Sequence, residues 1–353
     1  MVYHFGKTGY MIAAWQAAAG TAETLAGTDI GIPLKTKPGL KPIIDKEFPQ
    51  YYKKTSSEAS DYIVKRLAAE GELEFDAHTG GPLEMALFGV FGAVDSNVIT
   101  DTTTGISNVF TMTNSDLPMW TVGLGRGALN LEKYYDLRYG KLDMSMSGGE
   151  NVNVKVNAMG KGGNISQPEL TPTYTTDRSF VYDDIGVSLG GTPNCDVTSL
   201  NLSIDRGMKS KRTACAASPK GDNVFYPTTI NVEGDIEMFF QDFTEYKYWL
   251  GASNATEPTF DQTAATTKRA LTITMSGDAI GDGTPADNSA LIFTIPAISY
   301  SDAEIDMPWD DRMLIKFNFK ALFDQTSETG LAGTGTIKAQ VDSEFNAKTT
   351  FAA

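Results

Sequence analysis

The sequence AEGELEF at residues 69–75 returns, with conservative changes, as VEGDIEM at residues 232–238, an offset of 163 positions. Both copies alternate acidic and apolar side chains around a shared glycine. The acidic positions are Glu70, Glu72 and Glu74 in the first copy and Glu233, Asp235 and Glu237 in the second. Because successive side chains of a strand point to opposite faces of a sheet, each copy predicts a strand with one acidic and one apolar face.

Further segments repeat in the same order, which indicates a duplicated unit. The same offset pairs Leu142-Asp143-Met144 with Ile305-Asp306-Met307, and it pairs the alternating valines of 152–156 with the apolar residues of 315–319. A helix candidate follows the acidic strand in each copy, at residues 80–92 and 242–251. The pattern predicts a mainly β protein with two tandem β-sandwich domains, each flanked by one short helix. It also places Trp249, Met307 and Trp309 on buried faces.

The repeat sets the expected domain boundaries. The first domain covers residues 1–185, the second covers residues 186–325, and residues 326–353 form a C-terminal extension without a counterpart. Each domain has an early strand, at 28–34 and 198–204, followed by a long polar arm at about 35–66 and 206–226. Loops of this length inside a compact domain usually have a function, and reaching another subunit is one such function.

Both arms carry more basic than acidic residues, although the whole chain is acidic. Complementary charge between a basic arm and an acidic neighbouring subunit would set the orientation of a contact. The alternative is that these residues only keep flexible loops soluble. The candidate contact residues are Lys35, Lys37, Lys41, Lys53 and Lys54 in the first arm and Arg206, Lys209, Lys211 and Arg212 in the second.

The overall charge limits the classes of function. The 353 residues include 44 acidic and 29 basic side chains, which gives a formal net charge of −15. This balance argues against a protein that binds nucleic acid phosphates over a wide surface. Cys195 and Cys215, the only cysteines, form neither a disulfide framework nor a zinc-binding spacing. No apolar run approaches the roughly 18 residues that a membrane span needs.

The residue types that carry out catalysis do not gather into a recognisable motif. His4 and His78 lie outside any nucleophile or metal spacing. GLGRG at 123–127 lacks the spacing of a phosphate loop and predicts a β-turn or bulge. The aspartates of GDAIGDGTPADN at 277–288 lack EF-hand spacing and predict a hairpin loop. We therefore expect no catalytic residue, metal or cofactor.

Three segments carry a resemblance to a known family: LPMWTVGLGRG at 117–127, YYDLRYGKLDMSMSGGENVNVKVNAMGKG at 134–162, and the repeated strand and helix described above. Here the sequence resembles the tail tube proteins of phages with long, non-contractile tails, in the variety that fuses two tube domains in one chain. The resemblance implies stacked rings that form a hollow tube, an arm that touches the next ring, and a homotrimer with pseudo-sixfold symmetry. The length of the first arm and residues 326–353 depart from it.

The resemblance also implies a role for the acidic strands. Their six carboxylates would face the lumen, where an anionic wall keeps passing viral DNA mobile because it does not bind the phosphates. The implied partners are other copies of the chain, tail terminator and tail tip or baseplate proteins, and a tape measure protein inside the growing tube. The implied location is the virion tail, after synthesis in the host cytoplasm.

Other interpretations of the sequence remain open. A solvent-exposed strand face carries charges in any β-sandwich, so the acidic positions alone do not require a lumen. A surface fibre or adhesin subunit is an alternative all-β assembly protein. A glycan-binding or glycan-hydrolysing sandwich protein is a second alternative, which would need an aromatic platform and paired carboxylates in one cleft.

Overall fold

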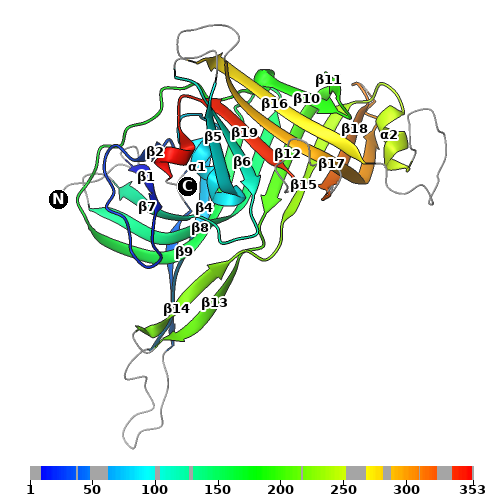
Figure 1. Ribbon diagram of the computed structural model, residues 1–353. Coiled ribbons are helices and arrows are strands. Elements are labelled where there is room, and N and C mark those ends of the chain that lie inside the picture. The colour runs from blue at the N-terminus through cyan, green and yellow to red at the C-terminus, as the bar shows by residue number, and fades with distance from the viewer. Residues whose placement is uncertain are drawn as a thin grey trace, which may run out of the picture.

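The structure is a computed structural model that describes residues 9–36, 39–47, 63–99, 104–126, 130–215, 218–251, 268–280, 288–309, 311–323 and 336–351. The protein is mainly β, with 60% strand and 9% helix, as the sequence predicts. In the described part of the chain, seventeen strands join one large sheet of almost entirely antiparallel pairs, and two more form a separate hairpin (Figure 1). None of the described helices is long and apolar enough to cross a membrane.

Eight of the described strands form a continuous layer that we call the polar-faced sheet. Its order is β3 (Lys41–Glu47), β4 (Ile63–Asp76), β9 (Asn153–Gln167), β8 (Leu131–Ser147), β12 (Val197–Asp205), β15 (Asn231–Phe239), β18 (Leu314–Ala321) and β17 (Asn288–Asp306). The pairing of β8 with β12 joins the first four strands to the last four. Both acidic strands, β4 and β15, therefore lie in one sheet.

The strand pairings of the first half recur in the second. The order β3-β4-β9-β8 matches β12-β15-β18-β17. In the outer layer, β2 (Ile30–Ile32), β1 (Gly9–Gln16) and β7 (Met119–Arg126) lead to β8, just as β11 (Thr192–Asn194), β10 (Ile185–Leu189) and β16 (Arg269–Ala279) lead to β17. Residues 123–126 of the segment GLGRG lie in β7, so of the expected turn or bulge the turn is wrong for these four residues.

The register of the sheet corrects part of the repeat. Leu73 on β4 lies opposite Val156, and its counterpart Ile236 on β15 lies opposite Phe317, so β9 and β18 are related by 161 positions and not by 163. The same offset relates β8 to β17, because Met144 pairs with Val154 and Ile305 pairs with Ile315. The difference of two residues leaves every side chain on its expected face, since strand side chains alternate with a period of two.

The other face of the polar-faced sheet is apolar and packs into the core, as the alternation predicts. Helix α1 (Pro82–Phe91) lies against this face and is buried along its whole length, whereas α2 (Thr244–Trp249) is only half-buried. Glu84 accepts hydrogen bonds from the backbone N–H groups of Gly80 (3.1 Å) and Gly81 (2.8 Å), which satisfies donors that the first turn of a helix leaves free. Both helices lie inside the ranges that the sequence indicates.

The C-terminal segment links the two halves. Strand β19 (Lys338–Ser343) pairs with β17 on one side and with β6 (Ile106–Met112) on the other, and β6 continues to β5 (Gly92–Val98). After α3 (Ala347–Thr350), Phe351 is fully buried and stacks on Phe88, with ring centroids 5.1 Å apart. Residues 336–351 thus complete the core of the first half.

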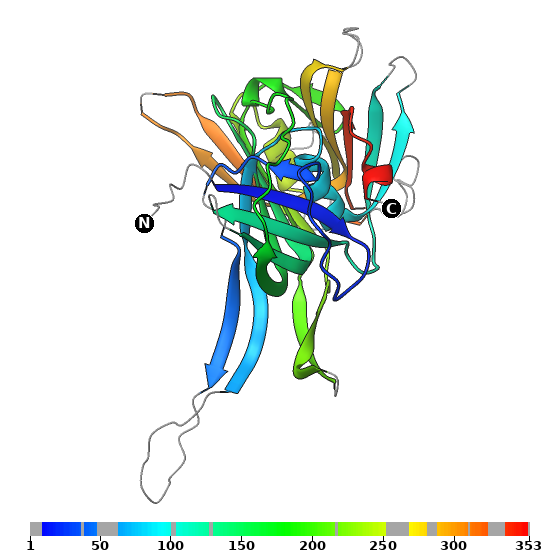
Figure 2. The same ribbon diagram turned by 90° about the vertical axis from the view of Figure 1, so that its left-hand side faces the viewer.

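Two hairpins project from one side of the body (Figures 1 and 2). One is formed by β3 and the start of β4, and the other by β13 (Lys209–Cys215) and β14 (Ser218–Tyr226). These hairpins occupy the positions of the two expected arms. Residues Lys37, Lys53 and Lys54 of the first arm lie outside the described residues, as does the side chain of Arg212 in the second.

Candidate functional site

The six predicted carboxylates lie on one face of the polar-faced sheet. Glu72 on β4 and Asp235 on β15 both lie opposite an asparagine, Asn157 and Asn318 respectively. The next acidic pair, Glu74 and Glu237, lies opposite Lys155 and Lys316. Side chains directly opposite each other on antiparallel strands are close enough to interact, so each acidic strand has a matched polar neighbour.

Glu74 is held in place by three neighbours. It accepts hydrogen bonds from Asn153 Nδ2 (3.1 Å) and Thr36 Oγ1 (2.9 Å), and Lys155 Nζ lies 3.6 Å from its Oε1. Desolvation raises the pKa of Glu74, but the hydrogen bonds and the Lys155 charge together outweigh it and lower the pKa. The carboxylate therefore stays ionised at neutral pH.

The second copy holds its carboxylates in a similar way. Asp235 accepts a hydrogen bond from Asn201 Nδ2 at 3.0 Å and lies 3.4 Å from Lys316 Nζ. Glu237 accepts from Ser199 Oγ at 3.2 Å. Amides and hydroxyls donate to these carboxylates from neighbouring strands, so the sheet itself positions the acidic groups.

The rest of this face is mixed in sign but mainly acidic. Among its described residues, the acidic side chains outnumber the basic ones. The acidic residues include Glu70, Glu72, Glu74, Asp76, Asp143, Asp205, Glu233, Asp235, Glu237, Asp302, Glu304 and Asp306, and the basic residues include Lys35, Lys41, Arg138, Lys141, Lys155, Lys316 and Lys320. The sequence reasoning found half of the acids. It did not place the lysines beside them, because the lysines lie on strands far apart in the chain.

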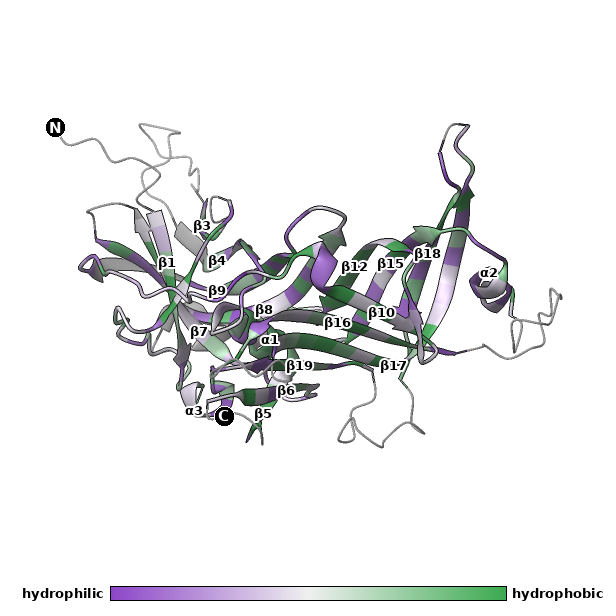
Figure 3. Ribbon diagram, turned by 90° about the horizontal axis from the view of Figure 1, so that it is seen from above, coloured by the Kyte–Doolittle hydropathy of each residue, from purple (hydrophilic) through white to green (hydrophobic). Residues whose placement is uncertain are grey.

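The polar face is concave. A hollow of about 640 Å³ lies at its centre, where the two halves meet, and β8, β9, β12, β15, β17 and β18 all contribute side chains to it. Its polar lining includes Lys141, Asp143, Asn153, Glu233 and Asp235. The polar face is therefore hollowed where the two halves meet, and Figure 3 shows the polar and apolar residues alternating along its strands.

Steric crowding explains why both acidic strands have a glycine at the same position, Gly71 in β4 and Gly234 in β15. A Cβ atom at Gly71 would lie 2.4 Å from Leu40 Cα, and a Cβ at Gly234 would lie 2.1 Å from the carbonyl oxygen of Asn201. The neighbouring strand crosses closely at both places, and only a residue without a side chain fits there.

The polar-faced sheet ends in two strands that have an open edge. In the described part of the chain, β3 pairs only with β4, and residues 299–306 of β17 pair only with β18. The hairpin of β17 and β18 extends beyond the body, as its orange strands in Figure 2 show. At its tip Met307 is 70% exposed and Trp309 is 103% exposed. The prediction that both are buried is wrong for the isolated chain, and Trp249 is only half-buried.

The arm residues fall into different environments. Lys35 pairs with Asp76 at 3.1 Å, and Lys41, Lys209 and Lys211 are exposed. Arg206 instead is 1% exposed, and its guanidinium donates to the carbonyl oxygens of Val90 (2.9 Å) and Thr113 (2.5 Å). Burial lowers the pKa of Arg206 to about 10, which keeps it charged at neutral pH. Its side chain therefore binds the carbonyl oxygens at the C-terminal end of α1 and is not available for a contact with another chain.

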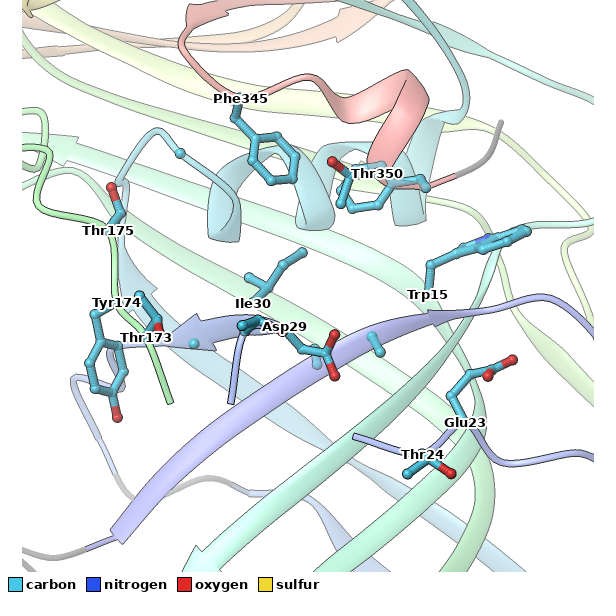
Figure 4. A pocket seen from close by; sticks show the side chains of 16 residues that line it. Trp15, Glu23, Thr24, Asp29, Ile30, Thr173, Tyr174, Thr175, Phe345 and Thr350 are labelled. Atoms are coloured by element: carbon cyan, nitrogen blue, oxygen red, sulfur yellow. The ribbon is translucent and has the colours of Figure 1, made fainter. Parts of the chain in front are cut away.

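A second hollow, of about 450 Å³, opens between β1, β2 and the C-terminal segment (Figure 4). Trp15, Asp29 and Phe345 contribute to its lining. Burial raises the pKa of Asp29 more than its hydrogen bond from Ala26 lowers it. Across the described residues, no group of three or more His, Cys, Asp or Glu side chains could hold a metal ion.

The chain was compared with known proteins. No curated protein matches it. A family model described as phage tail tube protein matches residues 55–321, about three quarters of the chain. This range includes both acidic strands, helices α1 and α2, and the joint between β8 and β12. The chain therefore belongs to the phage tail tube protein family, and it is a structural, non-enzymatic protein of the virion tail.

Proposed function

We propose that three copies of this chain close into a ring by pairing β17 of each chain with β3 of the next. The rings stack into the tube of a long, non-contractile tail, through which viral DNA passes. The observation that carries this proposal is the joint between β8 and β12, because the chain repeats the same strand order and leaves the equivalent edges, β17 and β3, open. A closed ring would remove both edges.

The internal joint supplies a register for the contact between chains. Asp143 on β8 lies opposite Ser203 on β12. Asp143 corresponds to Glu304 on β17, because each lies opposite an equivalent lysine, on β9 and on β18 respectively. Ser203 corresponds to Lys41 on β3, because each lies opposite an equivalent glutamate, on β15 and on β4 respectively. Both side chains are exposed and carry opposite charges. Their pairing would place an attractive contact on the polar face.

We also propose that residues 1–185 and 186–325 are two tandem tube domains. The repeated pairings support this division, and three chains then supply six similar units. About 24 strands spaced about 4.8 Å apart and tilted by about 40° close a barrel about 48 Å across at the backbone. Side chains that extend about 6 Å inward leave a bore of about 35 Å, which is wider than a DNA duplex.

The concave acidic face would line this bore. Three chains would set Glu70 with Glu233, Glu72 with Asp235 and Glu74 with Glu237 at three levels of six carboxylates each. Since a wall with this charge does not release counterions from DNA, it provides no electrostatic binding energy that would stop the duplex. DNA passes without specific binding.

Stacking would use the two arms, which leave the body on the same side. In a head-to-tail contact each ring reaches the next, and such contacts propagate into an open filament. The exposed Lys209 and Lys211, with Lys35, Lys37, Lys53, Lys54 and Arg212, remain candidates for this contact, whereas Lys41 is assigned to the edge contact within the ring. We leave out Arg206, because its side chain is buried within its own chain. Tail terminator and tail tip or baseplate proteins would close the two ends, and a tape measure protein would occupy the bore during assembly.

The test is a charge exchange at the proposed edge contact. Light scattering and electron microscopy of the purified wild-type chain at rising concentration should give trimeric rings or hollow tubes. Glu304→Lys alone and Lys41→Glu alone should both reduce assembly, whereas the double variant should recover it at unchanged net charge. A wild-type chain that forms hexamers or stays monomeric at every concentration would contradict the trimeric ring. A double variant no better than either single one would contradict the register.

A further inference from the structure

We infer that Met307 and Trp309 are the apolar anchor that docks the second half of one chain onto the first half of another copy of the same chain. The inference rests on the proposed ring, and it names the residues that make the contact between chains specific. Both side chains are apolar, and both are more exposed than any other described large apolar side chain.

The direction of these side chains follows from the strand. Ala303 and Ile305 lie opposite Phe317 and Ile315, which are buried on the apolar face of the sheet. Met307 and Trp309 follow directly after the end of β17 at Asp306, and the same alternation extended to them places both on the side of the apolar face. Here the described chain supplies no second layer to cover them. Two large apolar side chains exposed close together at the tip of one projecting hairpin offer a patch that another protein can cover.

The internal joint shows what covers the equivalent place. Met146 on β8 is the counterpart of Met307 and lies opposite Leu200 of β12. Both Met146 and Leu200 are 1% exposed, because the second half of the chain packs over them. Met307 is 70% exposed. The larger exposed fraction of Met307 shows that no part of the described chain packs over it at the open end of the sheet. A second copy provides this cover if its first half meets β17 as the second half meets β8.

Backbone pairing alone is weaker at this edge than inside the chain. The N–H of Gly39 donates to the carbonyl oxygen of Glu72 at 2.9 Å, so it points towards β4. The backbone N–H groups of a strand point alternately to its two sides, so the backbone of position 42, three residues after Gly39, faces the open edge. Position 42 is a proline, which has no N–H to donate. Proline on an edge strand also hinders pairing with unrelated strands. Side chains must therefore supply more of the contact between chains.

Trp309 distinguishes the joint within the chain, between β8 and β12, from the proposed joint between chains, between β17 and β3. Its counterpart in the first half is Gly148, which has no atom within 4 Å of the position where a Cβ would lie. The internal joint thus uses no aromatic side chain at this position, and Trp309, which is exposed, is available for a contact between chains. Tryptophan is enriched among the residues that dominate interface energies. The anchor would direct the open end of β17 to another chain.

The experiment compares Met307→Ser and Trp309→Gly with Val98→Ser, a control whose side chain is 69% exposed on β5. The assembly midpoint is measured by light scattering, and tryptophan emission is recorded as assembly proceeds. We expect each anchor variant to raise the midpoint concentration by about tenfold or more, with no change for the control. Wild-type emission should shift to shorter wavelength on assembly, and Trp309→Phe should abolish that shift.

The outcomes separate this inference from the proposed ring. If the wild type forms rings while Trp309→Gly and Met307→Ser assemble as the wild type does, the anchor is wrong and the ring stands. If the wild-type emission does not shift on ring formation, Trp309 stays in solvent and the anchor is wrong as well. If the wild type forms no ring at any concentration, both are overturned. Circular dichroism of each variant identifies loss of assembly that results from misfolding.

Discussion

Replacement of Arg206 by alanine should destabilise the folded chain by about 3–5 kcal/mol. The guanidinium donates to the carbonyl oxygens of Val90, Phe91 and Thr113, at 2.9, 3.3 and 2.5 Å. Val90 and Phe91 end α1, where helix carbonyls have no partner within the helix and the helix dipole favours a positive charge. Truncation removes the guanidinium donor from the buried carbonyl oxygens of Val90 and Thr113 and opens a cavity, whereas the carbonyl oxygen of Phe91 keeps the N–H of Thr113. Arg206→Lys keeps the charge but reaches fewer carbonyls, so its loss should be smaller.

Urea unfolding followed by circular dichroism gives the free energy of unfolding for each variant. Lys209→Ala is the matched control, because this side chain is exposed three positions later in the same arm and should change stability by less than about 0.5 kcal/mol. If Arg206 instead served only as a contact between rings, Arg206→Ala would leave the isolated chain as stable as the control. A loss below about 1 kcal/mol would therefore refute the assigned role at α1.

Three further predictions concern the sheet, the C-terminal segment and a buried acid. Gly71→Ala should cost more than about 2 kcal/mol in urea unfolding, because its Cβ would meet Leu40 Cα at 2.4 Å, whereas Gly148→Ala, in open space, should be nearly neutral. Phe351→Ala should cost about 3–5 kcal/mol and change the near-ultraviolet circular dichroism of Trp120, which it touches with ring centroids 5.1 Å apart; an unchanged spectrum would contradict this packing. Burial raises the pKa of Glu84 above 4.5, so the folded chain keeps this proton to higher pH than the unfolded chain does. Stability should fall as pH rises from 4.5 through the raised pKa, and Glu84→Gln should flatten this part of the unfolding profile.

The sequence predicts which face of the sheet a side chain occupies better than it predicts which strands pair and in what register. Alternation of side chains is local, so Leu73 and Glu72 were assigned to the correct faces without any knowledge of the sheet. The pairing register is not local, and the change from 163 to 161 between the acidic strand and the following hairpin became visible only through the partners of Leu73 and Ile236. The burial of Arg206 was missed for the same reason. Its acceptors on α1 lie more than 90 residues away, and a basic residue beside a charged arm has no local mark of burial.

The C-terminal segment had no signal that could assign it to the core of the first half. Its strand β19 is six residues long and pairs with β6, more than 200 positions earlier. Phe345 and Phe351 form an aromatic cluster with Phe88 and Trp120, which are likewise distant in sequence. The exposed tip at Met307 and Trp309 is a different case. The sequence pattern indicated an apolar face, and the isolated chain lacks the cover that such a face needs.

The mixture of charges on the polar face suits a conduit better than a purely acidic face would. Carboxylates two positions apart on a strand are about 7 Å apart, and at this distance two like charges in water repel by about 0.6 kcal/mol. Lys155 and Lys316 lie beside Glu74 and Asp235 and reduce this repulsion within the sheet. At physiological ionic strength the remaining negative charge acts over about 8 Å, so it reaches the surface of a duplex that fills most of the proposed bore. A duplex at the centre of the tube would be repelled equally from all sides, and one that approached the wall would be repelled towards the centre.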